Sequence, residues 1–242
     1  MDRDLLEVNG VLYPVKVHYD RRPHCTVTVR QGGINIRIPS SRNRKERSKK
    51  LSELKRLVAE KISKDPGRFK HIAQRSYNDG DRLVVGDDEY TLHISYKDKK
   101  SSSAVIEGNT IRLLISLNLS PGMRNDHIST LISRCVAQRR IDELRKKVAE
   151  LNRLHFNQPL KKISFKHNRS NWGSCSRAGN INISTRLLFA PDDVLEYVCV
   201  HELAHLIEPN HSSRFWGLVK SAMPDYREKI KWLKENGNRC DF

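Results

Sequence analysis

The chain has 242 residues and a formal net charge of +17 at pH 7, with 45 Lys and Arg side chains against 28 Asp and Glu. Its composition, 37% hydrophobic and 30% charged, favours exposed basic surfaces over a thick core and allows one large or two small domains. It has no run of about 18 uncharged apolar residues, no signal-peptide pattern and no CxxC pair, so we expect a cytoplasmic protein with reduced thiols and no membrane partner.

The first half of the chain predicts strands and a single helix. Alternating runs within residues 11–38 indicate strands, and the last two, TVTVR and INIRIP, are typical of an antiparallel hairpin around Gly32-Gly33. Apolar residues at helical spacing then predict a helix near residues 42–63, which Asp65-Pro66-Gly67 ends.

Two further hairpins are expected, at residues 82–96 and 104–117, because each pairs strand-like runs across a short polar turn. Residues 1–120 are therefore expected to form a β-rich N-terminal region with one helix near 42–63. No internal repeat with a period of 20–50 residues is visible in the chain, although both halves of this N-terminal region are rich in hairpins.

The second half of the chain, residues 121–242, predicts mainly helices. A long helical stretch is expected at about 122–154, and it could connect the two halves. The other expected elements are strands at 161–166 and 180–184, a helix after Pro191, and helices at about 212–222 and 224–236. The expected fold class is α+β, in which a β-rich region precedes a mainly helical region with a small antiparallel sheet.

The most apolar helix of the chain carries the residues with a chemical signature. Residues 192–207 are apolar on nearly all sides, which predicts a buried helix containing His201, Glu202 and His205. Two histidines one helical turn apart can bind one metal ion, and His211, six residues further on, could supply a third nitrogen. The glutamate beside them can take a proton from a water molecule that the metal activates.

Three protein ligands with an open fourth position are the arrangement of a catalytic zinc site, so the pattern predicts bound Zn²⁺. One alternative is a pair of core histidines bonded to carbonyl groups, with Glu202 in a buried salt bridge; another is a purely structural zinc. The spacing from His205 to His211 equals that of the metzincins, but Glu208 stands where those enzymes have glycine, and we reject that assignment.

Five other residues near the motif have competing interpretations. Glu208 would either orient a histidine or lie exposed at a helix end. Trp172 and Trp216 are interpreted as core residues in preference to substrate contacts, and Met223 as a core residue in preference to a Met-turn. Tyr226 either packs or donates a hydrogen bond to the oxyanion of the reaction.

A group of motifs within residues 165–236 resembles the YgjP-like (DUF45) family of zinc metallopeptidases. The motifs are NWGSC at 171–175, HELAHL at 201–206, Asn210-His211-Ser212, Phe215-Trp216 and Pro224-Asp225-Tyr226. The resemblance implies a gluzincin-like or SprT-like catalytic core with His201, His205 and His211 as metal ligands and Glu202 as the catalytic residue. Asn171 departs from the family, which usually has arginine before WGSC, so an ion pair made by that arginine is not expected here.

These observations lead us to interpret the chain as a zinc-dependent metallopeptidase that acts on protein or peptide substrates, with residues 121–242 as its zincin-like region. In such folds the substrate commonly lies along an edge strand, for which 161–166 and 180–184 are the candidates. Two alternatives stay open: a nucleic-acid-associated basic protein, which could act on DNA-bound proteins, and an inactive zincin used for binding. The densest basic run, residues 42–70 with 12 basic and 4 acidic side chains, would bind a nucleic acid or simply face water. The sequence predicts no oligomeric state.

Overall fold

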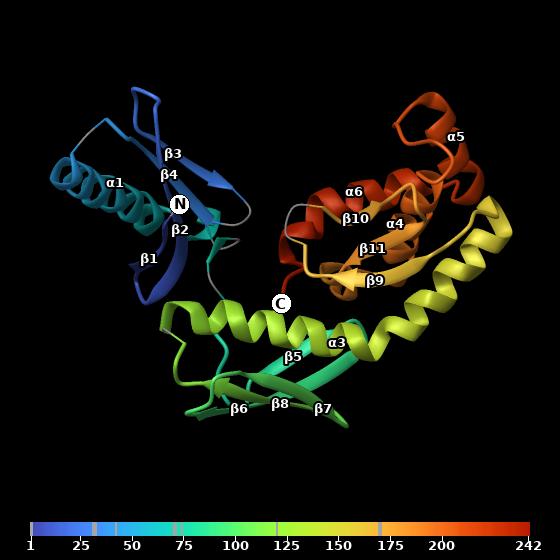
Figure 1. Ribbon diagram of the computed structural model, residues 1–242, viewed down its shortest axis with the longest axis horizontal. Coiled ribbons are helices and arrows are strands. Elements are labelled where there is room, and N and C mark those ends of the chain that lie inside the picture. Colours follow the sequence, from blue (N-terminus) through green and yellow to red (C-terminus); the bar gives the residue numbers. More distant parts are fainter. Residues whose placement is uncertain are drawn as a thin grey trace. The chain divides into compact units, whose positions relative to one another are not determined.

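The computed structural model describes residues 2–30, 33–41, 43–69, 72–73, 75–119, 121–168 and 171–242 (Figure 1). The chain divides into two compact units, Met1–Ser76 and Tyr77–Phe242. The α+β class is confirmed, because helices are combined with three small sheets. Among the described residues, no helix is both long enough and apolar enough to cross a membrane.

The first unit is a four-stranded sheet covered on one face by a helix. Its elements are β1 (Asp2–Val8), β2 (Val11–Asp20), β3 (Thr26–Arg30), β4 (Gly33–Pro39), α1 (Arg44–Lys64) and the short α2 (Pro66–Phe69). The strand order is β1-β2-β4-β3, and the central pair β2–β4 is parallel. Val58 and Ile62 of α1 are buried against the apolar face of the sheet, so the alternating strands and the helical stripe meet in one core.

The same arrangement recurs in the second unit, 77 residues further along the chain. Its elements are β5 (Arg82–Val85), β6 (Asp88–Lys97), β7 (Ser103–Glu107), β8 (Thr110–Ser116) and α3 (Pro121–Leu151). The strand order is β5-β6-β8-β7, again with a parallel central pair. Strand β6 has the bounds of β2 shifted by 77 residues, and the same shift relates β7 to β3 and β8 to β4. Helix α3 likewise begins 77 residues after α1.

The strand register and the buried positions of the two modules also correspond. Val15 lies opposite Ile34 in the first module, and Leu92 lies opposite Ile111 in the second. The matched buried residues are Tyr13 with Tyr90, Val15 with Leu92, Val17 with Ile94, Ile34 with Ile111, Ile36 with Leu113, and Ile38 with Ile115. One ββββα module therefore occurs twice, with a period longer than the 20–50 residues considered in the sequence.

Most of the expected N-terminal elements are confirmed. Strands β3 and β4 form the first antiparallel hairpin, although Gly32 of its turn lies outside the described residues. The hairpins β5–β6 and β7–β8 and the helix α1 also lie where they were expected. Strand β1 was not expected, because adjacent Leu5 and Leu6 break the alternation of its side chains. The boundary between the two compact units lies after Ser76, whereas the expected division was after residue 120, because the β5–β8 sheet shares a core with α3.

The rest of the second unit surrounds one buried helix. The elements are β9 (Lys162–Lys166), β10 (Gly173–Cys175), β11 (Asn180–Ser184), α4 (Asp192–Ala204), α5 (Ser213–Ala222) and α6 (Tyr226–Asn236). Helix α4 packs against α3, α5, α6 and the sheet, as Figure 1 shows. The sheet has the order β10-β11-β9 and is mixed, not purely antiparallel as expected, because β9 runs parallel to β11. The expectation that 180–184 is an edge strand was wrong, since β11 is central.

Candidate metal centre

Helix α4 holds the motif residues in the interior of the second unit. Its N-terminal Asp192 and Asp193 lie beside the positive end of the helix dipole and pair with Lys147 at 2.6 Å and Lys229 at 2.7 Å. The residues that follow are almost all buried in one core, so the position of α4 is set by packing on several sides. The regular helix ends at Ala204, which leaves the last motif histidine at the C-cap.

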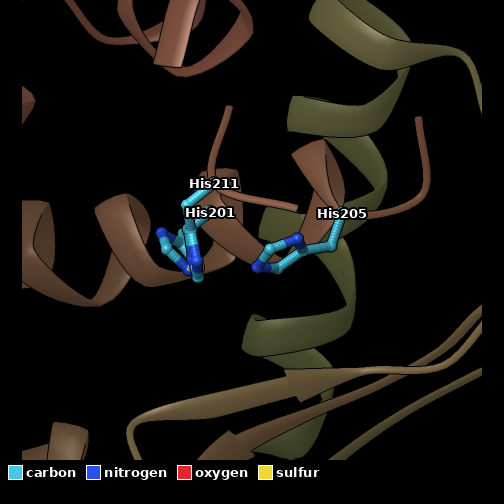
Figure 2. A group of neighbouring side chains, drawn as sticks. All are labelled: His201, His205 and His211. Carbon is cyan, nitrogen blue, oxygen red and sulfur yellow. Dashed lines mark hydrogen bonds between the residues drawn. The ribbon is translucent and has the colours of Figure 1, made fainter. Parts of the chain in front are cut away.

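The structure brings the three predicted histidines together at the C-terminal end of α4 (Figure 2). One nitrogen from each of His201, His205 and His211 lies within 4.8 Å of the others, and the two Nε2 atoms of His201 and His211 are 3.1 Å apart. Zn–N bonds of about 2.0–2.1 Å at tetrahedral angles require nitrogens about 3.3 Å apart. The 3.1 Å between the Nε2 atoms of His201 and His211 is close to this value, and a donor set of three imidazole nitrogens suits zinc.

Hydrogen bonds at Nδ1 orient two of the rings. The Nδ1–H group of His205 donates to the backbone carbonyl of Glu208 at 3.1 Å, which leaves Nε2 as the free acceptor and potential ligand. Nδ1 of His201 lies 3.4 Å from the hydroxyl oxygen of Tyr197, one helical turn earlier. Glu208 thus contributes its backbone, not its carboxylate, to orienting a histidine.

His211 reaches the other two rings because the chain turns back after Pro209. Helix α5 then begins directly after His211, with Ser212 as its N-cap. The hydroxyl oxygen of Ser212 accepts a hydrogen bond from the backbone N–H of Phe215 at 3.3 Å, which starts α5 directly after His211. The connection between the two helices therefore places His211 one residue before the N-cap of α5.

Two aromatic side chains pack against the three imidazoles. The fully buried ring of Phe215 has its centre 4.9, 4.5 and 4.8 Å from those of His201, His205 and His211. Trp216 stacks on His211 at 5.8 Å between ring centres. Trp216 had been interpreted as a core residue and Phe215 had no assigned role. Their i, i+1 position beside a capping serine does not indicate which rings they touch, because that depends on how α5 packs on α4.

Burial keeps the histidines in the form that binds metals. Burial, and then the nearby His205 and His211, lower the pKa of His201 to about 4, and burial also lowers the pKa of His205. Both rings are therefore neutral at physiological pH, and a neutral imidazole is the metal-binding form.

Glu202 lies on the buried side of the motif, 5% exposed. Burial raises the pKa of its carboxyl group to about 7, and within the described part of the chain no hydrogen bond to that group is found. Gly173 of β10 lies against it, because a Cβ atom on Gly173 would be 2.4 Å from Oε1 of Glu202. The glycine of the NWGSC motif thus makes room for the glutamate, a relationship between residues 29 positions apart that spacing alone does not indicate.

The remaining residues near the motif are buried or packed against neighbouring side chains. Met223 and Tyr226 are buried, and Tyr226 stacks on Trp216 at 5.3 Å. The guanidinium of Arg186 lies 4.1 Å from the ring centre of Trp172. Cys175 is half-buried, and burial, followed by the nearby Glu202, raises the pKa of its thiol to about 11, so it is not an activated nucleophile.

Three converging imidazoles, with a buried carboxyl group on the same helix, are typical of a metal-dependent hydrolase. The chain belongs to the YgjP-like, metallopeptidase domain family, whose model matches residues 23–236. That family class implies a metal ion and a protein or peptide substrate.

Two solved structures are similar to part of the chain. The metallopeptidase zymogen abylysin of Pyrococcus abyssi is 22% identical, with 38% of this chain and 92% of that chain covered and a TM-score of 0.35. The zymogen jannalysin of Methanocaldococcus jannaschii is 20% identical, with 36% and 92% covered and a TM-score of 0.31. No curated protein matches the chain.

Proposed function

We propose that the protein is a zinc metallopeptidase in which His201, His205 and His211 bind one Zn²⁺ and Glu202 acts as general base. The convergence of three imidazole nitrogens within 4.8 Å at the end of a helix that also holds the buried Glu202 carries this proposal. Bound zinc would supply Lewis acidity to a peptide carbonyl and lower the pKa of a water molecule.

The protein's own residues then have separate roles. Tyr197 and the Glu208 carbonyl hold two imidazoles in the tautomer that presents Nε2. Glu202 takes a proton from the attacking water and delivers it to the amine nitrogen as the C–N bond breaks. A carboxyl pKa near 7 suits both transfers, because the group can accept and release a proton near neutral pH.

A peptide substrate would extend the small sheet at β10. This strand is an edge of the β10-β11-β9 sheet, and its Gly173 lies against Glu202. A peptide paired to this edge by main-chain hydrogen bonds would pass beside the general base. The other edge, β9, is separated from β10 by β11. The catalytic function proposed here thus rests on elements within residues 121–242.

The test combines metal analysis with a matched active-site variant. We expect about one zinc per chain in the purified wild type and in Glu202→Gln, because glutamine leaves the three histidines in place. Peptide-library digestion followed by mass spectrometry should give wild-type products, while Glu202→Gln should be slower by about 10²–10⁴-fold.

A wild-type protein that binds zinc but cleaves no peptide of the library would favour the alternative, a zincin used only for binding. Equal cleavage by wild type and Glu202→Gln would remove Glu202 as the base.

A further inference from the structure

The water-facing side of α1 in the first unit carries a strong excess of positive charge. The helix has nine basic and three acidic residues. Within the described residues, ion pairs connect three of its cations to carboxylates: Lys50 to Glu53, Lys55 to Asp4, and Arg56 to Glu60. Arg44, Lys45 and Lys49 are exposed and have no such pair.

Three of the exposed cations form a line along the helix, which we call the basic stripe: Lys45, Lys49 and Arg56. At 100° per residue they lie within about 40° of one another, and Lys49 is about 180° from the buried Val58. At 1.5 Å per residue the stripe is about 16 Å long, close to five base-pair steps of 3.4 Å. Because Lys49 lies opposite the buried Val58 on the helix, the basic stripe faces away from the core of its own module.

The second module shows that the fold does not need these charges. The positions 77 residues after Lys45, Lys49 and Arg56 are Gly122, Asp126 and Ser133.

Arg47 is the one basic residue of α1 that has a basic counterpart, Arg124. These two make the same contact, since Arg47 lies 5.1 Å from the ring centre of Tyr19 and Arg124 lies 5.6 Å from that of Tyr96. The arginine therefore makes a packing contact that both modules share, whereas the cations of the basic stripe have no counterpart in the second module.

Lys45 and Lys49 of the basic stripe have no ion pair within the described residues, whereas Arg56 pairs with Glu60 at 3.8 Å. Lys45 lies in the first turn, where the helix dipole is positive, and a cation there is unfavourable. Lys45 and Lys49 are like charges at i, i+4, which also disfavours the helix. The same side of α1 also carries Glu53 and Glu60, which lie about 40° and 20° from Lys49, so an anionic partner would meet the net excess of nine basic over three acidic residues on the helix.

We propose that the basic stripe binds the phosphodiester backbone of a nucleic acid. A line of cations about 16 Å long matches a line of phosphates, and release of condensed counterions would drive binding. The apolar side of α1 packs in the core of its own unit, and among the described residues Leu57, 42% exposed, is the one large apolar side chain that the helix exposes, which is too little to insert into a membrane surface. Binding would be independent of base sequence, since cations on phosphates do not distinguish bases.

The test measures fluorescence polarisation of a labelled 20-base-pair DNA duplex, and of an RNA duplex of equal length, with the full chain at several salt concentrations. Substitution of the basic stripe (Lys45→Gln, Lys49→Gln, Arg56→Gln) should weaken binding at least about tenfold. It should reduce the slope of log K against log salt by about 2.7 for DNA, at about 0.9 per lost phosphate contact. The conservative variant Lys45→Arg, Lys49→Arg should bind like the wild type.

A matched control removes three other exposed cations that have no ion pair in the described part of the chain: Arg134→Gln, Lys146→Gln and Arg153→Gln. This control has the same net charge as the stripe variant and should bind like the wild type. Equal weakening by both triple variants would overturn the proposal, because net charge alone would explain binding. Absence of binding to both duplexes at low salt would also overturn it. Zinc content should stay unchanged in all variants, so failure here does not affect the metallopeptidase proposal.

Discussion

A methyl group added to Gly173 would lie 2.4 Å from Oε1 of Glu202, so strand β10 lies directly against the carboxyl group of the proposed general base. This contact joins the NWGSC motif to the HELAH motif. It accounts for a glycine at a position whose backbone does not need one, since Gly173 is not among the residues with positive φ.

The first prediction concerns that contact. Gly173→Ala should push Glu202 aside, lower the rate of peptide hydrolysis by about 10²-fold, and reduce the free energy of unfolding by about 1–3 kcal/mol. Zinc content should be unchanged, because the three atoms nearest to the added Cβ all belong to Glu202 and none to a histidine. The control is Gly217→Ala on α5, where an added Cβ meets nothing within 4 Å. This variant should keep the wild-type rate of hydrolysis and should not lower the free energy of unfolding, because alanine favours a helix interior over glycine. Full activity of Gly173→Ala would show that Glu202 can move without loss.

The second prediction tests the third ligand. His211→Ala should lower zinc affinity at least about 100-fold in competition with a chelating dye, because it removes one of three converging nitrogens. His24→Ala, which removes an exposed histidine from the first unit, should keep wild-type affinity. Unchanged zinc affinity in His211→Ala would exclude this residue from the metal site.

The third prediction tests the group that orients His201. Tyr197→Phe keeps the buried ring but removes the hydroxyl that lies 3.4 Å from Nδ1 of His201. Zinc affinity should fall about tenfold, as is typical when a partner of a ligating histidine is removed. Tyr13→Phe, a buried tyrosine of the first unit, is the control for loss of a phenol group. If the two variants bind zinc equally well, the hydroxyl does not contribute to orienting the ligand.

The fourth prediction follows from the raised pKa of Glu202 in the metal-free protein. Its pKa is about 7 when folded, against about 4.3 for an unfolded chain, so this group favours folding fully below pH 4.3 and less as the pH rises through 7. In excess chelator, Glu202→Gln should therefore be more stable than wild type at pH 8 by about 3 kcal/mol, and nearly equal to it at pH 4.5. Urea unfolding of both proteins at the two pH values measures the difference. The titrating histidines are common to both proteins and cancel. A constant difference across this pH range would contradict the raised pKa.

Several features of the fold follow from local patterns of residues. The apolar stripe of α1, the hairpins β5–β6 and β7–β8, and the buried character of α4 were all expected, because each depends on neighbours within one or two turns of the chain. The proximity of His201 and His205 has the same origin, since helical periodicity places residues i and i+4 on one side.

Packing between distant segments decided the rest. The parallel pairing of β2 with β4 and of β6 with β8 joins strands that are not adjacent in sequence. The residues of one strand do not indicate which other strand it pairs with. The 77-residue repeat is clear in the register but faint in the sequence, because a fold restricts the size and burial of core side chains more than their identity.

For the metal site, the local pattern of HELAH predicted two histidines and a glutamate on one side of a helix. The contacts of Phe215 with three imidazoles and of Gly173 with Glu202 were decided by how α5 and β10 pack on α4. Hydrophobic burial, which is non-directional along the chain, brings these elements together. Residue spacing in the sequence therefore could not show which side chains surround the motif.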